Sequence, residues 1–172
     1  MNKITIEDIA IIVVLTAILF AQEALLSFLP NFQLTVFLLV LYSKKLGLLK
    51  TSLIILVHAI LDTMIFGAMN FIYLPFIIMG WILIPITLNT IFKKVESNII
   101  LALLGILFSL LYSWIYIIPS VWLLDIGVLE YLAADLLWEV VLAISSFLTI
   151  LLLYNPCSRL FDRILNNNQA IE

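Results

Sequence analysis

Charged side chains are scarce in this sequence: Asp, Glu, Lys and Arg make up 11% of its 172 residues, against about 25% in ordinary soluble domains. A soluble domain needs polar residues to cover its surface, so this scarcity excludes a soluble globular protein. Eight basic residues stand against eleven acidic ones, which gives a net charge of −3 and no basic face for nucleic acid. Because 65% of the residues are hydrophobic, disorder is excluded too. The remaining class is an integral membrane protein with small loops.

The sequence also lacks the residues on which common catalytic and ATP-binding motifs depend. None of its five glycines belongs to a Walker A motif, and a single histidine is too few for an ordinary zinc protease site. There is no Gly-x-Ser-x-Gly motif. The single cysteine, Cys157, excludes an intrachain disulfide, and we interpret it as a small packing residue. We therefore expect a protein that is not an enzyme and that has no cofactor.

Long apolar runs are what the sequence has instead. A transmembrane helix needs about 20 mostly apolar residues, and the runs are continuous rather than alternating as barrel strands would be. Thr5 and Asp8 are spaced to form a capping box at the start of the first run. The segment before a cleaved signal peptide's apolar run is basic, whereas Glu7 is acidic, so we expect the first run to be a membrane span. We predict one all-α domain over residues 1–172, an integral membrane bundle of six transmembrane helices at Ile6–Phe28, Phe32–Ser43, Leu48–Phe66, Ile72–Phe92, Ile99–Ile118 and Tyr131–Leu153.

The basic residues orient this predicted bundle, because all eight fall on one side of the six-span topology. They are Lys3, Lys44, Lys45, Lys50, Lys93, Lys94, Arg159 and Arg163. By the positive-inside rule that side is cytoplasmic. Both termini are then cytoplasmic, and the loops at 29–31, 67–71 and 119–130 face outward. We expect a multi-pass protein of the cell membrane.

Four carboxylic acids lie inside the predicted spans, where burying a charge costs at least ~2.5–3.5 kcal/mol. They are Glu23, Asp62, Asp135 and Glu139. All lie within about two turns of the outer ends of three spans; Glu23, for example, is roughly 8 Å from the end of its span. His58 lies one turn below Asp62 on the same helix face, and Asp135 and Glu139 share a face by their i, i+4 spacing. We interpret this common level as a polar cavity that is open to the outside.

Aromatic and amide side chains fall in the same zone. Apolar and aromatic walls with a few convergent polar groups are typical of small-molecule sites. Because no Lys or Arg lies on the outer side to bind phosphate or carboxylate, we expect a neutral or cationic ligand, flat enough to stack on tryptophan. The predicted binding residues are the four acids and His58, together with Asn31, Gln33, Asn70, Tyr73, Trp81, Trp122 and Trp138.

These residues also have structural interpretations, which the sequence leaves open. Glu23 could simply reach the membrane interface, Asp62 and His58 could form a buried structural pair, and Asp135 could be partly hydrated. Several of the aromatic residues could belong to the belts that line membrane interfaces. This alternative applies to Tyr73, Trp114 and Trp122.

Small residues form a stripe along one face of the first span. We call Ala10, Ala17, Ala21 and Ala24 the alanine stripe, because their spacings of seven, four and three residues place them on one helix face. Small side chains let another helix approach closely. The stripe predicts either packing inside this bundle or docking onto a second membrane protein.

Several stretches resemble the substrate-binding S components of energy-coupling factor (ECF) vitamin transporters. Leu29–Thr35 resembles the Pro-Asn-x-Gln-Leu loop after the first helix in one S-component subfamily. Tyr73–Phe76, leading to Trp81, is similar to the fourth helix of that subfamily, and Ala134–Pro156 is similar to its last helix. The resemblance implies that the chain binds a vitamin or related micronutrient outside the cell.

The same resemblance implies a docking partner. Ala17-x-x-x-Ala21 resembles the Ala-x-x-x-Ala by which S components contact the membrane-embedded T subunit, and the T subunit carries two ATPase subunits. The chain departs from the family at Trp138 and Glu139, where the last helix commonly has His and Asn, and at Asp62, which is often Glu. These departures leave the identity of the ligand open.

Two other functions stay open at this point. The spans also resemble the rod-shape membrane protein MreD, which is of similar size and has an Asp followed by a Gly in its third helix, here Asp62 and Gly67. A chain of this kind would be a membrane scaffold of the cell-shape machinery. The other alternative is a solitary proton-coupled carrier that uses Asp62 and Glu139.

Overall fold

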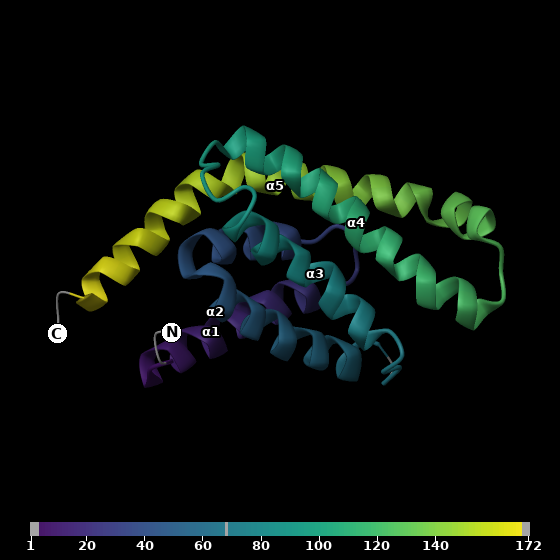
Figure 1. Cartoon of the computed structure of the whole chain (residues 1–172), viewed down its shortest axis with the longest axis horizontal. Helices are drawn as coiled ribbons and strands as arrows, with labels where there is room; N and C mark the ends of the chain where they lie inside the picture. The colour runs from purple at the N-terminus through teal and green to yellow at the C-terminus, as the bar shows by residue number, and fades with distance from the viewer. Residues whose placement is uncertain (1–3, 68, 170–172) are drawn as a thin grey trace.

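The computed structural model describes residues 4–67 and 69–169, with side-chain surroundings up to residue 164. It is all-helical over these residues, with no strand in them (Figure 1). The all-α prediction is confirmed. Four of the helices, α1, α2, α4 and α5, are long and apolar enough to cross a membrane. The helices are α1 (Ile6–Leu26), α2 (Thr35–Ile65), α3 (Leu74–Asn89), α4 (Asn98–Leu124) and α5 (Val128–Gln169).

Residues 4–67 and 69–169 form five helices, where the sequence predicted six. The predicted spans 32–43 and 48–66 both belong to α2, which is interrupted by non-helical backbone at Gly47, with φ 78° and ψ −175°. This combination of angles is open essentially to glycine alone. The course of the chain changes sharply there (Figure 1). The count of six crossings and the cytoplasmic position of both termini stay predictions.

Two helix ends lie farther along the chain than the sequence indicated. α4 continues through Pro119 to Leu124, so the predicted outer loop 119–130 shrinks to a short turn. Asp125 ends α4 in the left-handed conformation, with φ 53° and ψ 43°, as is common at helix C-termini. α5 likewise continues through Pro156. The two predicted spans stopped before these prolines, yet membrane helices tolerate proline, because neighbouring groups satisfy the backbone atoms that it frees.

The start of α1 matches its prediction. The Thr5 hydroxyl accepts a hydrogen bond from the backbone N–H of Asp8, and the Asp8 carboxylate accepts one from the backbone N–H of Thr5, both at 3.2 Å. This is the predicted capping box. Asp8 also forms an ion pair with Lys50, which ties the start of α1 to the second half of α2.

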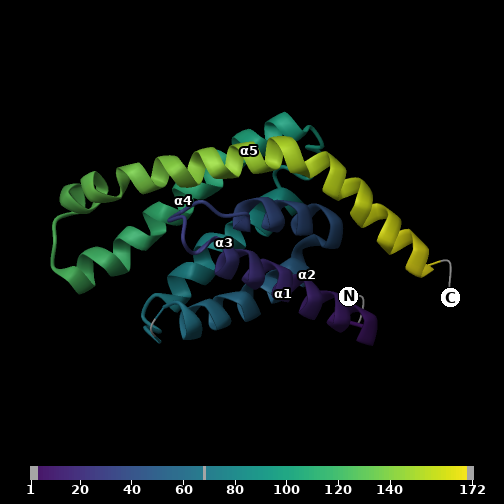
Figure 2. The same ribbon diagram turned by 180° about the vertical axis from the view of Figure 1, so that it is seen from behind.

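The first half of α2 lies at the centre of the bundle. All nine residues of 35–43 are buried, because α2 packs against α1, α3, α4 and α5 (Figures 1 and 2). A helix that is buried on every side needs no polar face, which explains the continuous apolar run here. Elsewhere large apolar side chains point outward, such as Val13, Ile118 and Leu152. Such an outer surface is suited to hydrocarbon rather than to water.

Candidate functional site

A cavity of about 310 Å³ lies beside the loop between α1 and α2, and we call it the acidic cavity. Its volume is at the lower end of the range for small-molecule sites. α1 contributes Glu23, the second half of α2 contributes His58 and Asp62, and α3 contributes Trp81. Six of the predicted binding residues line it together: Glu23, Asn31, Gln33, His58, Asp62 and Trp81.

Glu23 and His58 form the polar centre of this cavity. The Oε2 atom of Glu23 lies 3.3 Å from the Nε2 atom of His58, and the two side chains are 14% and 1% exposed. The other Glu23 oxygen accepts a hydrogen bond of 2.6 Å from the Thr35 hydroxyl. The Nδ1 atom of His58 is buried with no hydrogen-bond partner in the described part of the chain. The close polar contact of His58 is therefore with Glu23 on the neighbouring helix, and not with Asp62 on the same helix as His58.

Glu23 belongs to a network of hydrogen-bonded amide and hydroxyl groups that the sequence analysis did not predict. The Gln22 side-chain amide donates to the Thr35 hydroxyl at 2.8 Å, and its carbonyl oxygen accepts from the backbone N–H of Leu34 at 2.8 Å. Ser145 of α5 exchanges hydrogen bonds with the backbone of Gln33. These bonds hold the 27–34 loop against α1 and α5. The sequence feature that could have indicated this network is Gln22, a polar residue next to Glu23 within an apolar span.

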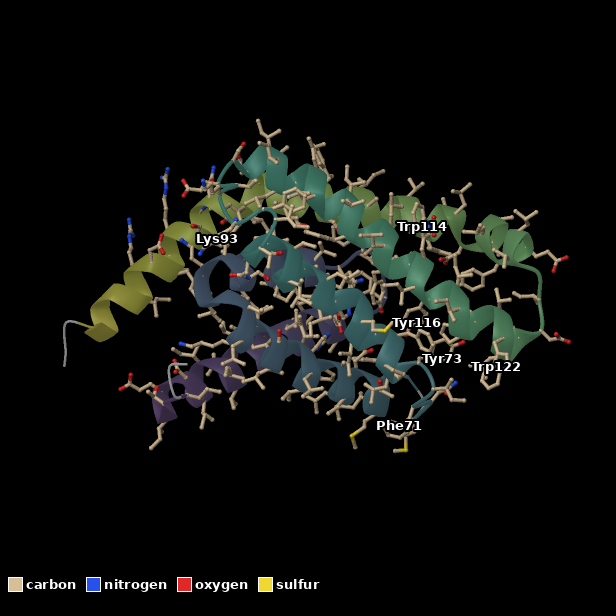
Figure 3. The ribbon with its side chains drawn as sticks, in the orientation of Figure 1. Phe71, Tyr73, Lys93, Trp114, Tyr116 and Trp122 are labelled. Atoms are coloured by element: carbon tan, nitrogen blue, oxygen red, sulfur yellow. The ribbon has the colours of Figure 1, made fainter. Side chains whose placement is uncertain are left out.

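An aromatic stack begins at the wall of the acidic cavity, where Trp81 and Tyr112 line it. The rings of Trp81 and Tyr112 lie face to face, with centroids 3.7 Å apart and planes 13° apart. Tyr112 neighbours Tyr116, which stacks on Tyr73 at 5.1 Å (Figure 3). Trp81 is only 2% exposed, and one of its faces is covered by Tyr112. A ligand can therefore use less of this tryptophan than the sequence suggested. Tyr112 lies in the middle of α4, where the sequence offered no reason to select it.

A second cavity of about 310 Å³ adjoins the first, because Asp62 and Phe66 line both. Asn70 and Tyr73, two further predicted residues, line this second cavity together with Tyr116. Asp62 thus lies at the boundary of two cavities. Of the twelve predicted binding residues, six line the acidic cavity and two more line the second cavity.

The remaining four predicted residues line neither cavity. Trp122 lies near the end of α4 (Figure 3) and is 73% exposed, and Trp138 is 39% exposed. Asp135 accepts a hydrogen bond of 2.9 Å from the Ser113 hydroxyl, which joins α5 to α4. Glu139 is 6% exposed, and its Oε1 atom has no hydrogen-bond partner among the described residues. The role of these residues in binding stays a prediction.

The alanine stripe faces outward. All four of its alanines are exposed on α1. This exposure favours the second of the two interpretations that the sequence left open, and docking onto another membrane protein stays a prediction. Ala17 and Ala21 are free to meet a second membrane protein.

The acidic cavity offers two carboxylates and one imidazole, and none of its described lining residues is Lys or Arg. It can therefore accept hydrogen bonds from a donor-rich ligand and pair with a positive charge. It is poorly suited to an anion, because a carboxylate would repel one. Comparison of the chain with models of protein families, with curated proteins and with solved structures finds no match.

Proposed function

We propose that this chain is the substrate-binding subunit of a membrane importer, of the S-component type. In this proposal it captures a small neutral or cationic micronutrient in the acidic cavity and delivers it by docking on a T subunit that carries two ATPases. The observation that carries the proposal is the convergence of Glu23, His58 and Asp62 in one cavity. The loop that resembles the S-component motif, at residues 29–35, borders the same cavity.

Asp62 is the side chain that we assign to a cationic group of the ligand. Glu23 already contacts His58 and Thr35, whereas Asp62 takes part in none of the salt bridges found among the described residues. A carboxylate in this setting is costly unless a counter-charge or a donor meets it. A ligand with an amine, amidine or ring N–H would offset that cost.

The proposal includes the membrane orientation. The two halves of α2 cross separately, which makes six crossings with both termini in the cytoplasm. Seven basic residues of the described chain then lie on the inner side: Lys44, Lys45, Lys50, Lys93, Lys94, Arg159 and Arg163. The acidic cavity would open outward, as a capture site requires. α3 has 16 residues, or roughly 24 Å of helix, and would cross with the help of the turns that flank it.

We expect a small molecule to co-purify with the protein, and we expect Asp62→Asn to weaken its binding about 10- to 100-fold. A charge-assisted hydrogen bond contributes about 1.5–3 kcal/mol, and the amide keeps the shape of the side chain while removing its charge. Mass spectrometry of protein purified from cells grown in rich medium identifies the compound, and calorimetry with that compound measures the affinity.

Asp125→Asn is the matched control for this experiment. It makes the same chemical change at an exposed position outside both cavities, and asparagine suits the left-handed backbone there. Preparations that stay empty under every growth condition would contradict the proposal. Uptake by the purified chain alone under a pH gradient would favour a proton-coupled carrier, and loss of rod shape on deletion would favour a scaffold.

Ala17→Leu should abolish uptake while leaving the binding of the co-purified compound unchanged. The larger side chain keeps the partner helix at a distance, because close approach depends on small residues. Pull-down of a co-expressed T subunit reads out docking directly. Ala133→Leu, the same change at an exposed position of α5, should leave both properties intact. An Ala17→Leu variant that still pulls down the T subunit would refute docking through this stripe.

A further inference from the structure

A polar cavity of about 440 Å³ is lined by Lys93, which lies far from Tyr73 and Trp122 (Figure 3). It forms where the residues before Gly47, the loop between α3 and α4, and the C-terminal part of α5 meet. We call it the lysine pocket. Its lining residues include Lys44, Lys45, Lys93, Glu96, Asn155 and Ser158.

Two of these lysines are held in place by the fold. The Lys44 Nζ atom donates to the backbone carbonyls of Phe92 and Lys93, at 2.9 and 3.2 Å. An ammonium group has three N–H donors, so one remains for a ligand. The Lys45 Nζ atom pairs with Asp162 at 2.7 Å, and the Lys45 side chain is only 17% exposed. These ammonium groups therefore have defined positions, unlike those of lysines that extend freely into water.

The lysines that line the pocket outnumber the carboxylates that line it or pair with them by one. Three lysines line it, and the nearby carboxylates are Glu96, in the lining, and Asp162, paired with Lys45. Three minus two leaves a charge of +1. Lys93 is exposed and belongs to none of the ion pairs found in the described part of the chain. Asn155 and Ser158 add neutral donors beside it. A single anionic group with several acceptor oxygens matches this set of donors.

We propose that the lysine pocket binds the phosphodiester of an anionic phospholipid. A phosphodiester carries one negative charge, and its oxygens accept hydrogen bonds from lysine ammonium groups. Apolar side chains beside the pocket point outward: Ile91, two residues before Lys93, is 75% exposed, and Leu152, three residues before Asn155, is 67% exposed. Basic residues at this junction of charged and apolar surface are typical of contacts with lipid headgroups. The proposal requires only that the helices lie in a membrane, and it is independent of the importer function.

Native mass spectrometry of the detergent-solubilised protein tests this proposal, with phosphatidylglycerol and phosphatidylcholine offered at equal concentration. We expect phosphatidylglycerol adducts to dominate. Lys93→Gln should lower their occupancy constant about fivefold, the effect of one lysine near an anionic lipid. Lys94→Gln is the matched control, because it removes the same charge one residue away, at an exposed position outside the pocket. It should change the constant less than twofold.

Two results would overturn the proposal. Equal binding of the two lipids, or equal losses in the Lys93 and Lys94 variants, would mean that the protein has only general attraction for anionic surfaces. Displacement of phosphatidylglycerol by millimolar inorganic phosphate or glycerol phosphate would assign the pocket to a soluble phosphate compound instead. Thermal unfolding of both variants serves as the check that neither replacement alters the fold.

Discussion

Gly47→Ala is expected to destabilise the protein by about 1–3 kcal/mol, the cost of holding a non-glycine residue in this backbone region. Gly47 has φ 78° and ψ −175° at the break in α2. The added methyl group has room, since the nearest atom, Oδ1 of Asn89, would lie 3.8 Å away. The penalty therefore comes from the backbone alone. It exceeds the gain of about 0.5–1 kcal/mol that alanine normally brings within a helix.

The unfolding of the purified protein in detergent, followed by circular dichroism, measures this effect. A second readout is the retention of the co-purified compound, because relief of the strain by straightening α2 would move His58 and Asp62 away from Glu23. Gly127→Ala is the control. A methyl group there meets only the Glu130 side chain, at 3.6 Å or more, and the backbone φ is not positive. If the two variants are equally stable, the break at Gly47 is not maintained by glycine.

Gly80→Ala is expected to destabilise the protein by about 1–3 kcal/mol for a different reason, which is overpacking. A methyl group at Gly80 would lie 2.6 Å from the Cδ2 atom of Tyr112, so the tyrosine ring must move. That ring is stacked on Trp81 at 3.7 Å. The replacement should therefore loosen the aromatic wall of the acidic cavity as well as the contact between α3 and α4.

Near-UV circular dichroism and detergent unfolding report on this change, because Trp81 is the one tryptophan of the described chain that is buried. The double variant Gly80→Ala/Tyr112→Leu should be more stable than the sum of the two single effects predicts, since the smaller side chain leaves space for the methyl group. Strictly additive losses would show that the two positions do not conflict, and the cavity wall would then depend on other contacts.

The position of each acidic residue along its helix could be predicted from the sequence, but the side chains that it contacts could not. Glu23 and Asp62 were expected at one level, and the structure brings them to one cavity. Asp135 and Glu139 were expected beside them, yet Asp135 bonds to Ser113 of α4 and neither residue lines a cavity with Asp62. Sequence spacing sets the angle between residues on one helix, but the rotation of that helix against its neighbours follows from packing.

The break in α2 also separates what the sequence predicts from what only packing decides. The apolar runs on both sides of Gly47 were visible in the sequence, together with the lysines beside it. That the first run is enclosed on all sides, with residues 35–43 buried, could not be seen. A buried helix and a lipid-exposed helix are both continuously apolar, so hydropathy does not distinguish them.

The sequence by itself determined that this is an all-helical protein suited to a membrane, where its apolar runs lie, and how α1 begins. These properties depend on the hydrophobicity and hydrogen-bonding capacity of neighbouring residues, which are local. Only the tertiary structure decided that His58 contacts Glu23, that Tyr112 covers Trp81, and that the alanine stripe faces outward. These depend on how the helices rotate and pack against one another, and packing is settled by the whole set of side chains at once.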